Sequence, residues 1–358
     1  MNSIRLKIDS NILRAAIAAL AVIALSATVS TFAQTATPEN PVSQAPSAAA
    51  PASGLTLCPG GPPVTGPVSG PTSTFTVYDG TTLRRGEYVF SSNFANNAAE
   101  VRTLSLNSKL MKRSVPYRVV LPAGYDAKSS TRYPVIYLLH GLWGHYDDWT
   151  SKTKLAEYAA NYNFIVVTPE GDDSWYVDNP SKPADKYESY IVQELIPEID
   201  NKFATMPDRG HRVIAGLSMG GYGAVKFGFK FPQMFTLVGS FSGVIGTADF
   251  GEKTILPAIG KKIDAVFGPA GSELRSANDI FRMARELTPA STKALPFIYQ
   301  SCGTEDSLLI KNNRDFLSIL NDKRVPHEYR EHPGKHEWPF WDDQVREFLA
   351  VADRMIKK

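Results

Sequence analysis

The residues of this chain with the clearest chemical meaning are Gly216, Ser218 and Gly220, which form the pattern Gly-x-Ser-x-Gly. The apolar run 213–215 just before them is typical of a buried parallel strand, and a helical pattern begins near residue 224. A strand, a sharp turn and a helix around one serine predict a nucleophile elbow. In such a turn the glycines allow close packing and the serine hydroxyl stands clear of the backbone.

A serine hydroxyl is a weak nucleophile unless a base accepts its proton and an acid orients that base. Two later loops supply candidates, because Asp306 follows a predicted strand at 296–300 and His336 follows one at 327–330. The carboxyl ends of parallel strands meet at one edge of a sheet, and the chain order Ser, Asp, His is the α/β-hydrolase order. We therefore expect Ser218 as nucleophile, Asp306 as acid and His336 as base.

Each of these loops also holds an alternative. Glu305 is adjacent to Asp306, and either carboxylate could instead be a solvated loop charge or a cap of the following helix. His332 stands directly at the strand end and could be a structural histidine. We favour His336 because it follows a flexible Pro-Gly-Lys turn and can reach inward.

An acyl-transfer site also needs hydrogen-bond donors for the negative oxygen that develops on the substrate carbonyl. The main-chain N–H of Met219, directly after the nucleophile, is the first candidate. The second is the N–H of Leu142, which follows a His140-Gly141 pair at the end of the predicted strand 133–139. His140 is expected to be a structural turn residue.

The remaining pattern places these residues on alternating strands and helices, which predicts a mostly parallel sheet with helices on both faces. The predicted segments are an antiparallel edge at 101–106 and 116–121, further strands at 164–167 and 235–240, and helices at 152–162, 187–203 and 308–320, with a final helix that bears Trp341, Val345, Phe348, Ala352 and Met355 on one face. Pro197 predicts a kink or a late start in the helix 187–203. The mostly helical segment 246–294 interrupts the alternation, so we expect a small helical insertion that covers the site.

The N-terminal residues predict a secretory signal peptide over 1–33. Arg5, Lys7 and Arg14 precede an uncharged apolar run at 15–29, and small residues stand before Gln34. The alternative is an uncleaved membrane anchor, but this run is short for a bilayer span, which needs about 20 residues. The mature protein is therefore expected to be secreted or periplasmic.

Residues 34–73 are rich in Pro, Ala, Ser, Gly and Thr, which predicts a disordered spacer before one globular domain at 74–358. Cys58 lies in this spacer, and Cys302 lies in the domain. In an exported protein the two could form a disulfide, or Cys302 could be a plain buried thiol.

The composition excludes several classes of function. A formal net charge of +2 over 358 residues offers no basic surface for nucleic acid and no polybasic membrane patch. The two cysteines match no metal motif, so no metal is expected. A neutral or mildly polar small-molecule or carbohydrate substrate fits this charge balance.

Four motifs together resemble a known esterase family of α/β-hydrolases. They are His140-Gly141, the Gly-Leu-Ser-Met-Gly-Gly run at 216–221, Gly-Thr-Glu-Asp at 303–306 and Gly-Lys-His-Glu-Trp at 334–338. The family includes esterase D (S-formylglutathione hydrolase), bacterial feruloyl esterases and mycolyltransferases, and the similarity runs from about Glu100 to the C-terminus. The resemblance implies an α/β-hydrolase fold without a cofactor and the same three catalytic roles. The exported leader does not suit the cytosolic formylglutathione role.

Three hypotheses of function follow. The first is a secreted serine carboxylesterase that hydrolyses a small acyl ester or a carbohydrate-linked, feruloyl-type ester through an acyl-enzyme. The second is an acyltransferase that moves an acyl group to a sugar, and the third is a non-catalytic binding protein, against which the complete triad argues. Four aromatic residues are candidates for stacking on a sugar or phenolic ring, with core and rim packing as the alternative: Trp143, Trp175, Tyr176 and Trp338.

Overall fold

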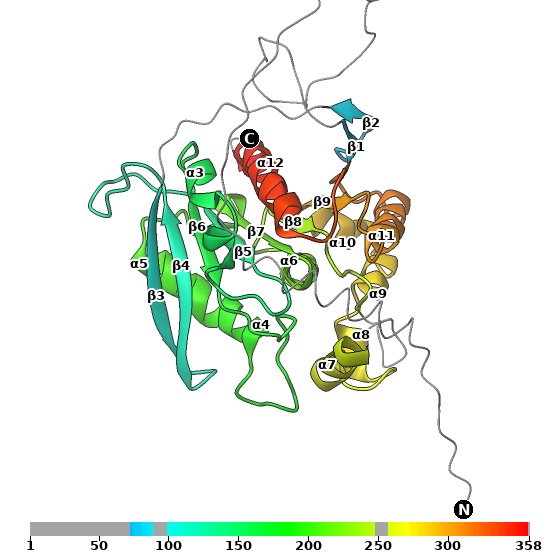
Figure 1. Cartoon of the computed structure of the whole chain (residues 1–358), viewed down its shortest axis with the longest axis horizontal. Coiled ribbons are helices and arrows are strands. Elements are labelled where there is room, and N and C mark those ends of the chain that lie inside the picture. The colour runs from blue at the N-terminus through cyan, green and yellow to red at the C-terminus, as the bar shows by residue number, and fades with distance from the viewer. Residues whose placement is uncertain (1–71, 89–98, 248–256, 357–358) are drawn as a thin grey trace, which may run out of the picture. The chain divides into compact units, whose positions relative to one another are not determined.

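The computed structural model describes residues 72–88, 99–247 and 257–356 (Figure 1). The predicted signal peptide and almost all of the predicted spacer, with Cys58, lie outside these residues, so both predictions and the Cys58–Cys302 pairing remain untested. Cys302 is fully buried against Leu309 and Tyr329, and burial raises the pKa of its thiol. Within the described ranges, no helix is both long and apolar enough to span a bilayer.

The described residues form one ten-stranded sheet in the order β2-β1-β10-β9-β8-β7-β5-β6-β4-β3. The strands from β10 to β6 in this order are mutually parallel, and antiparallel pairs close both edges. The strands are β1 (Ser73–Tyr78), β2 (Leu83–Tyr88), β3 (Glu100–Ser108), β4 (Arg113–Leu121), β5 (Val135–Leu139), β6 (Ile165–Pro169), β7 (Arg212–Leu217), β8 (Leu237–Phe241), β9 (Phe297–Gly303) and β10 (His327–His332). The mostly parallel sheet agrees with the sequence pattern.

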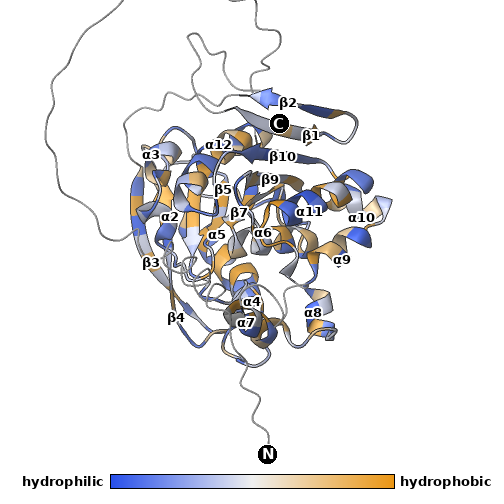
Figure 2. Ribbon diagram, turned by 45° about the vertical axis from the view of Figure 1, so that its right-hand side comes forward, coloured by the Kyte–Doolittle hydropathy of each residue, from blue (hydrophilic) through white to orange (hydrophobic). Residues whose placement is uncertain are grey.

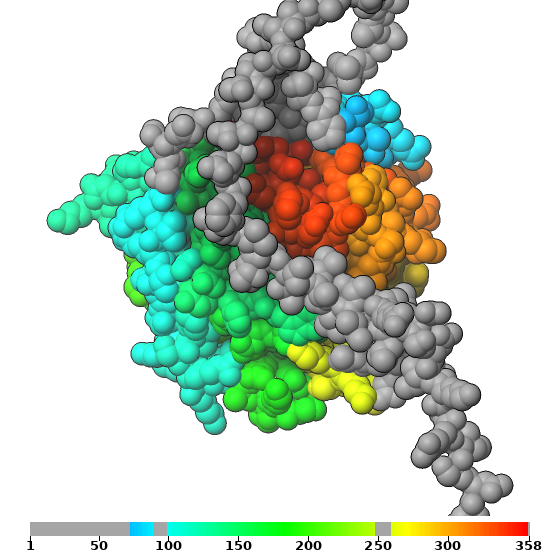
Figure 3. Space-filling view, viewed as in Figure 1, coloured from blue at the N-terminus to red at the C-terminus, as the bar shows by residue number. Residues whose placement is uncertain are grey.

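Helices cover both faces of this sheet. They are α2 (Asp148–Ser151), α3 (Leu155–Ala159), α4 (Tyr187–Ser189), the π-helix η2 (Tyr190–Leu195), α5 (Ile196–Lys202), the 3₁₀ turn η3 (Arg209–His211), α6 (Met219–Lys230), α7 (Pro257–Phe267), α8 (Glu273–Ala277), α9 (Ile280–Arg285), α10 (Pro289–Ala294), α11 (Ile310–Asp322) and α12 (Trp338–Ile356). In the space-filling view the C-terminal segment (red) lies on the surface between green and orange parts of the chain (Figure 3). Helices α7 to α10 form the expected insertion.

The side-chain alternation of the central strands divides the core into two layers. Val135, Tyr137 and Leu139 of β5 pack in the cluster that includes α5, α6 and α11. Ile136 and Leu138 pack on the opposite face, in the cluster formed with α3 and α12. The carboxyl ends of the strands are thereby held at one edge between the two helical layers, where the loops after β5, β7, β9 and β10 emerge.

Two features differ from the sequence expectation. The hairpin of β1 and β2 extends the sheet beyond β10, whereas only the β3–β4 edge was predicted. The predicted helix 187–203 consists of α4, η2 and α5. Pro197 lies two residues after η2, and Leu195 and Ile196 have helical backbone angles, so η2 continues into α5 without a break. The π-helical turns therefore stand directly before the proline, and the late start predicted from Pro197 is wrong.

Strand β10 is polar in sequence, with the run His-Glu-Tyr-Arg-Glu-His, yet it is largely buried (blue in Figure 2). Arg330 is 1% exposed and donates hydrogen bonds to Glu328 Oε1 and Glu347 Oε2, both at 2.7 Å. Its guanidinium also lies 4.8 Å from the ring centre of Tyr88, which belongs to β2. Burial opposes the charge, but Glu328 and its other neighbours raise the pKa of Arg330 well above its usual value. This ion network joins the added hairpin and α12 to β10.

Arg330→Met is expected to lower the free energy of unfolding by about 3–5 kcal/mol, because it leaves the buried Glu347 carboxylate without its guanidinium partner and Glu328 with Arg354 alone. Urea denaturation monitored by circular dichroism measures the change. The matched control is Arg314→Met, which removes an exposed guanidinium from its ion pair with Glu331 and should cost less than about 1 kcal/mol. Equal losses in the two variants would contradict a special role for the buried network.

Candidate active site

Ser218 lies on a strained turn between β7 and α6. Its backbone has φ +52° and ψ −113°, a conformation that side-chain-bearing residues rarely adopt. The Ser218 N–H donates to Phe241 O at 2.9 Å, and the Ser218 carbonyl accepts from Val244 N at 3.2 Å. The strained residue is therefore held by β8 and by the segment that follows it.

Close backbone packing explains why glycines flank this serine. A Cβ on Gly216 would lie 2.5 Å from the carbonyl carbon of Gly220, and a Cβ on Gly220 would lie 2.5 Å from Leu139 O. Both distances are shorter than any real Cβ contact, so α6 could not approach β7 and β5 with larger residues at these positions. The sharp turn at Ser218 thus requires both glycines of the Gly-x-Ser-x-Gly pattern.

The three residues predicted to act together are joined by hydrogen bonds. Ser218 Oγ lies 3.0 Å from His336 Nε2, and His336 Nδ1 lies 2.8 Å from Asp306 Oδ2. The Asp306 side chain is fully buried, and its other oxygen accepts from Leu309 N at 3.1 Å. The His336 side chain is 27% exposed. A fixed carboxylate, an oriented imidazole and an adjacent hydroxyl are the geometry of an activated serine nucleophile.

The two alternative residues lie outside this hydrogen-bonded chain. Glu305 is exposed to solvent. His332 is buried and bonds Tyr88 Oη at 3.1 Å and Ser73 Oγ at 2.8 Å, which places it in the β10 ion network. Burial lowers the pKa of His332. Its partners give it a structural role at the added hairpin.

Both candidate oxyanion donors belong to backbone segments that border Ser218. Met219 is the first residue of α6, so its N–H has no partner within the helix. A Cβ on Gly141 would lie 2.5 Å from Leu217 Cδ1 and 3.5 Å from Ser218 Cβ, so the loop that carries Leu142 packs directly beside the nucleophile. The loop after β5 and the start of α6 therefore border the same space.

His140 and Tyr176 stabilise the loop after β5, which carries Leu142, by hydrogen bonds to its backbone. His140 is buried, and its Nδ1 lies 2.8 Å from Gly141 O while its Nε2 lies 3.2 Å from Glu170 Oε1 and 2.9 Å from Gly171 N. The Tyr176 hydroxyl donates to the His140 carbonyl at 2.9 Å. Burial opposes ionisation of the adjacent Glu170, but its hydrogen bond with His140 and bonds from backbone N–H groups lower its pKa to about 2. The expected structural role of His140 agrees with these contacts.

Side-chain atoms of His145, Glu170 and Asp172 lie within 4.8 Å of one another and could in principle hold a metal ion. Their carboxylates already have other partners, however. Asp172 Oδ2 accepts from Arg113 at 3.1 Å and from Tyr187, and Glu170 accepts from the N–H groups of Gly171 and Asp172. A cation here would face the Arg113 guanidinium, so we assign no metal-binding role to this cluster.

The four candidate aromatic residues are placed differently. The Trp143 side chain is 46% exposed and Trp338 is partly exposed. Trp175 is 2% exposed and packs edge-on against Tyr222, and Tyr176 is fully buried. Trp175 and Tyr176 are therefore not available to stack on a sugar or phenolic ring, because both rings are enclosed by core packing. The sequence could not distinguish buried from exposed aromatic residues among these segments.

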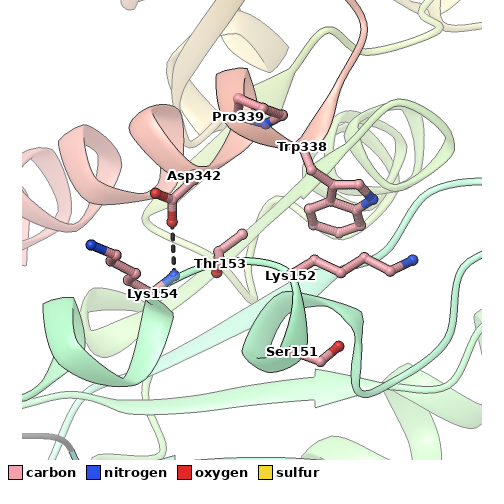
Figure 4. Close-up of a pocket in the computed structure, with 7 residues that line it drawn as sticks. All are labelled: Ser151, Lys152, Thr153, Lys154, Trp338, Pro339 and Asp342. Carbon is pink, nitrogen blue, oxygen red and sulfur yellow. Dashed lines mark hydrogen bonds between the residues drawn. The ribbon is translucent and has the colours of Figure 1, made fainter. Parts of the chain in front are cut away.

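An open pocket of about 390 Å³ lies beside Trp338 (Figure 4). Its lining residues are Ser151, Lys152, Thr153, Lys154, Trp338, Pro339 and Asp342. The Lys152 ammonium lies 5.1 Å from the Trp338 ring centre. Trp338 packs edge-on against Trp341 at 5.3 Å, and Trp341 packs edge-on against His336 at 4.9 Å. The Trp341 ring thus packs between Trp338, which lines the pocket, and His336.

Comparisons with known proteins agree with this geometry. The family model described as "Putative esterase" matches residues 108–350. An acetyl esterase of Caldicellulosiruptor saccharolyticus is 28% identical over 68% of this chain and 95% of its own length. An S-formylglutathione hydrolase of Mus musculus is 25% identical over 63% of this chain and 82% of its own length. A solved ferulic acid esterase matches 72% of this chain and 100% of its own with a TM-score of 0.62 and 26% identity, which confirms the α/β-hydrolase fold.

Tyr176→Phe is expected to lower the free energy of unfolding by about 1–3 kcal/mol, because the buried His140 carbonyl loses its hydrogen-bond donor. Urea denaturation measures the loss. The control is Tyr190→Phe, which removes a buried hydroxyl that has no partner among the described residues and should change stability by less than about 0.5 kcal/mol. An unchanged free energy of unfolding in Tyr176→Phe would contradict the stabilising role of this hydrogen bond.

Proposed function

Because the chain belongs to the esterase family, we propose that it is an exported serine carboxylesterase that works through an acyl-enzyme. The observation that carries this proposal is the hydrogen-bonded chain from Ser218 Oγ through His336 to Asp306. The predicted signal peptide supports export. The reaction needs no metal or cofactor, since every step below uses groups of this chain.

In the proposed reaction Ser218 Oγ attacks the ester carbonyl carbon while its proton passes to His336 Nε2. The new C–O bond leaves a negative oxygen, which accepts hydrogen bonds from the N–H groups of Leu142 and Met219. His336 then gives its proton to the leaving alcohol as the ester C–O bond breaks. Asp306 stabilises the imidazolium throughout and keeps its Nε2 directed at the serine.

In the second half of the reaction, water replaces the alcohol. His336 accepts a proton from the water, whose oxygen attacks the acyl-enzyme carbonyl, and returns that proton to Ser218 Oγ as the acid leaves. The 27% exposure of the His336 side chain supports water access at this step. This exposure favours hydrolysis over transfer to a sugar acceptor, which requires that water be excluded. The complete chain of hydrogen bonds argues against a non-catalytic binding protein.

Ser218→Ala is expected to lower kcat on p-nitrophenyl acetate by more than about 10³-fold, because no other group can form the acyl-enzyme. His336→Ala should cause a loss of the same order, since residues that act as one unit are not additive. The exposed Ser130→Ala is the control and should keep full activity. Turnover retained in Ser218→Ala would contradict the proposed mechanism.

For the substrate, we propose a small acyl ester or a feruloyl-type ester of a carbohydrate. Two relatives are named an acetyl esterase and a ferulic acid esterase, which supports an acetyl or aromatic acyl group. The pocket beside Trp338 supports a carbohydrate on the alcohol side. It combines an indole ring with hydroxyl, ammonium and carboxylate groups, and sugars bind to such mixed surfaces by stacking and hydrogen bonding.

Trp338→Ala is expected to lower kcat/KM for a feruloylated xylo-oligosaccharide by about 5- to 10-fold, because the sugar loses its stacking partner. Methyl ferulate, which has no sugar, serves as the matched substrate and should be affected less than about twofold. A sugar acceptor added to parallel reactions tests for acyl transfer by mass spectrometry. Equal losses on both esters would remove the pocket from substrate binding.

A further inference from the structure

The Leu142 N–H and the Gly141 carbonyl belong to one peptide unit. The described residues contain no cis peptide bond, so this unit is trans, and its N–H and C=O point in opposite directions. A group that holds the Gly141 oxygen therefore also fixes the direction of the Leu142 N–H. Among the described residues this N–H has no hydrogen-bond partner, as an oxyanion donor requires.

Two groups hold the Gly141 oxygen. The Gly144 N–H donates to it at 3.1 Å and closes a turn within the loop. The Nδ1 atom of His140 lies 2.8 Å from the same oxygen. A carbonyl oxygen accepts hydrogen bonds and cannot donate them, so this second contact is a bond only when His140 carries a proton on Nδ1. Without that proton, two lone pairs would face each other at this distance.

The opposite side of the His140 ring is anchored in the loop after β6. Its Nε2 lies 2.9 Å from Gly171 N and 3.2 Å from Glu170 Oε1. A neutral ring with its proton on Nδ1 accepts at Nε2 from the Gly171 N–H, and a charged ring donates from Nε2 to the Glu170 carboxylate. Nδ1 keeps its proton in both states. The buried ring thus ties the Gly141 oxygen to a second segment, whereas Gly144 holds it only from within the turn.

Tyr176 contacts the same loop at a different peptide unit. Its hydroxyl donates at 2.9 Å to the His140 carbonyl, which shares a peptide unit with the Gly141 N–H. Tyr176 therefore stabilises the loop without holding the peptide that carries the Leu142 N–H. The two contacts allow the stability of the loop to be separated from the direction of its donor.

We propose that His140 is a positioning residue for the esterase reaction, in which the hydrogen bond from its Nδ1–H to Gly141 O holds the Leu142 N–H in the direction that serves the oxyanion. This inference rests on the proposed function and deepens it. His140 acts through the backbone and does not touch the substrate. Glu170 and the Gly171 N–H orient the ring, and the proton on Nδ1 is the essential part of the arrangement.

The test compares two variants of the same shape on p-nitrophenyl acetate. Asn and Leu side chains are nearly isosteric, and both remove the Nε2 contacts, but only Asn can donate to Gly141 O from the position of Nδ1. His140→Leu should lower kcat by about 10- to 100-fold with KM nearly unchanged, because an oxyanion donor acts in the transition state. His140→Asn restores the hydrogen bond and should stay within about fivefold of the wild type.

Tyr176→Phe is the control for stability. It should lower the free energy of unfolding in urea yet keep kcat within about threefold of the wild type, because the Gly141 oxygen keeps both of its donors. The proton on Nδ1 is measured without turnover, by nitrogen-15 magnetic resonance of the imidazoles in the wild-type protein. The signal that disappears in His140→Asn assigns the His140 ring.

Three outcomes would overturn the inference. The first is an equal kcat in His140→Asn and His140→Leu, and the second is a kcat in Tyr176→Phe as low as that in His140→Leu. The third is a wild-type His140 ring with its proton on Nε2 alone. The spectrum judges the contact with Gly141 even if the wild-type protein hydrolyses no ester. Absence of all ester hydrolysis in the wild type, with the proton found on Nδ1, would instead count against the proposed function.

Discussion

The positive φ of Ser218 is the constraint on which the site depends. A serine held in this conformation points its hydroxyl away from the strand, but the backbone keeps it only because neighbouring segments hold it. Phe241 and Val244 bind its N–H and its carbonyl, and glycines let α6 approach β7 and β5. The loops that carry Asp306 and His336 then need only to bring His336 within hydrogen-bond distance of the fixed Ser218 hydroxyl. Strain at one residue is balanced by the ordered packing of the central parallel strands around it.

The histidine side of the site depends on a different kind of interaction. His336 follows β10, a strand whose buried side chains are mostly polar and whose Arg330 is enclosed by carboxylates and aromatic rings. Buried ions cost desolvation energy, which their mutual attraction and hydrogen bonds offset only when every partner is in place. The added β1–β2 hairpin supplies part of that enclosure through Tyr88. The edge of the sheet is therefore linked to the position of the loop that carries His336.

The sequence predicted the central strands, the family resemblance and the chain order of the triad residues, and the structure and the comparisons confirm the first two. Hydrogen bonds join Ser218, His336 and Asp306, and their catalytic roles stay a prediction. The hairpin at Ser73–Tyr88 was missed because both strands are short, β2 is mostly polar, and the hairpin follows a Pro-rich segment. For Trp175 and Tyr176 the alternative of core packing holds, which the sequence could not decide because exposure depends on what packs over a loop, and helix α7 and Gly223 of α6 lie far away in sequence.

By itself the sequence determined those features that depend on local backbone geometry and on periodic burial. Glycines beside Ser218, apolar strands and polar loops at their carboxyl ends are visible without coordinates, because steric limits and hydrophobic burial act on neighbouring residues. Only the tertiary structure decided the hydrogen bond from Tyr176 to the His140 carbonyl and the enclosure of Arg330. These features arise from contacts between residues far apart in the chain, and such contacts exist only after the sheet and its covering helices have assembled.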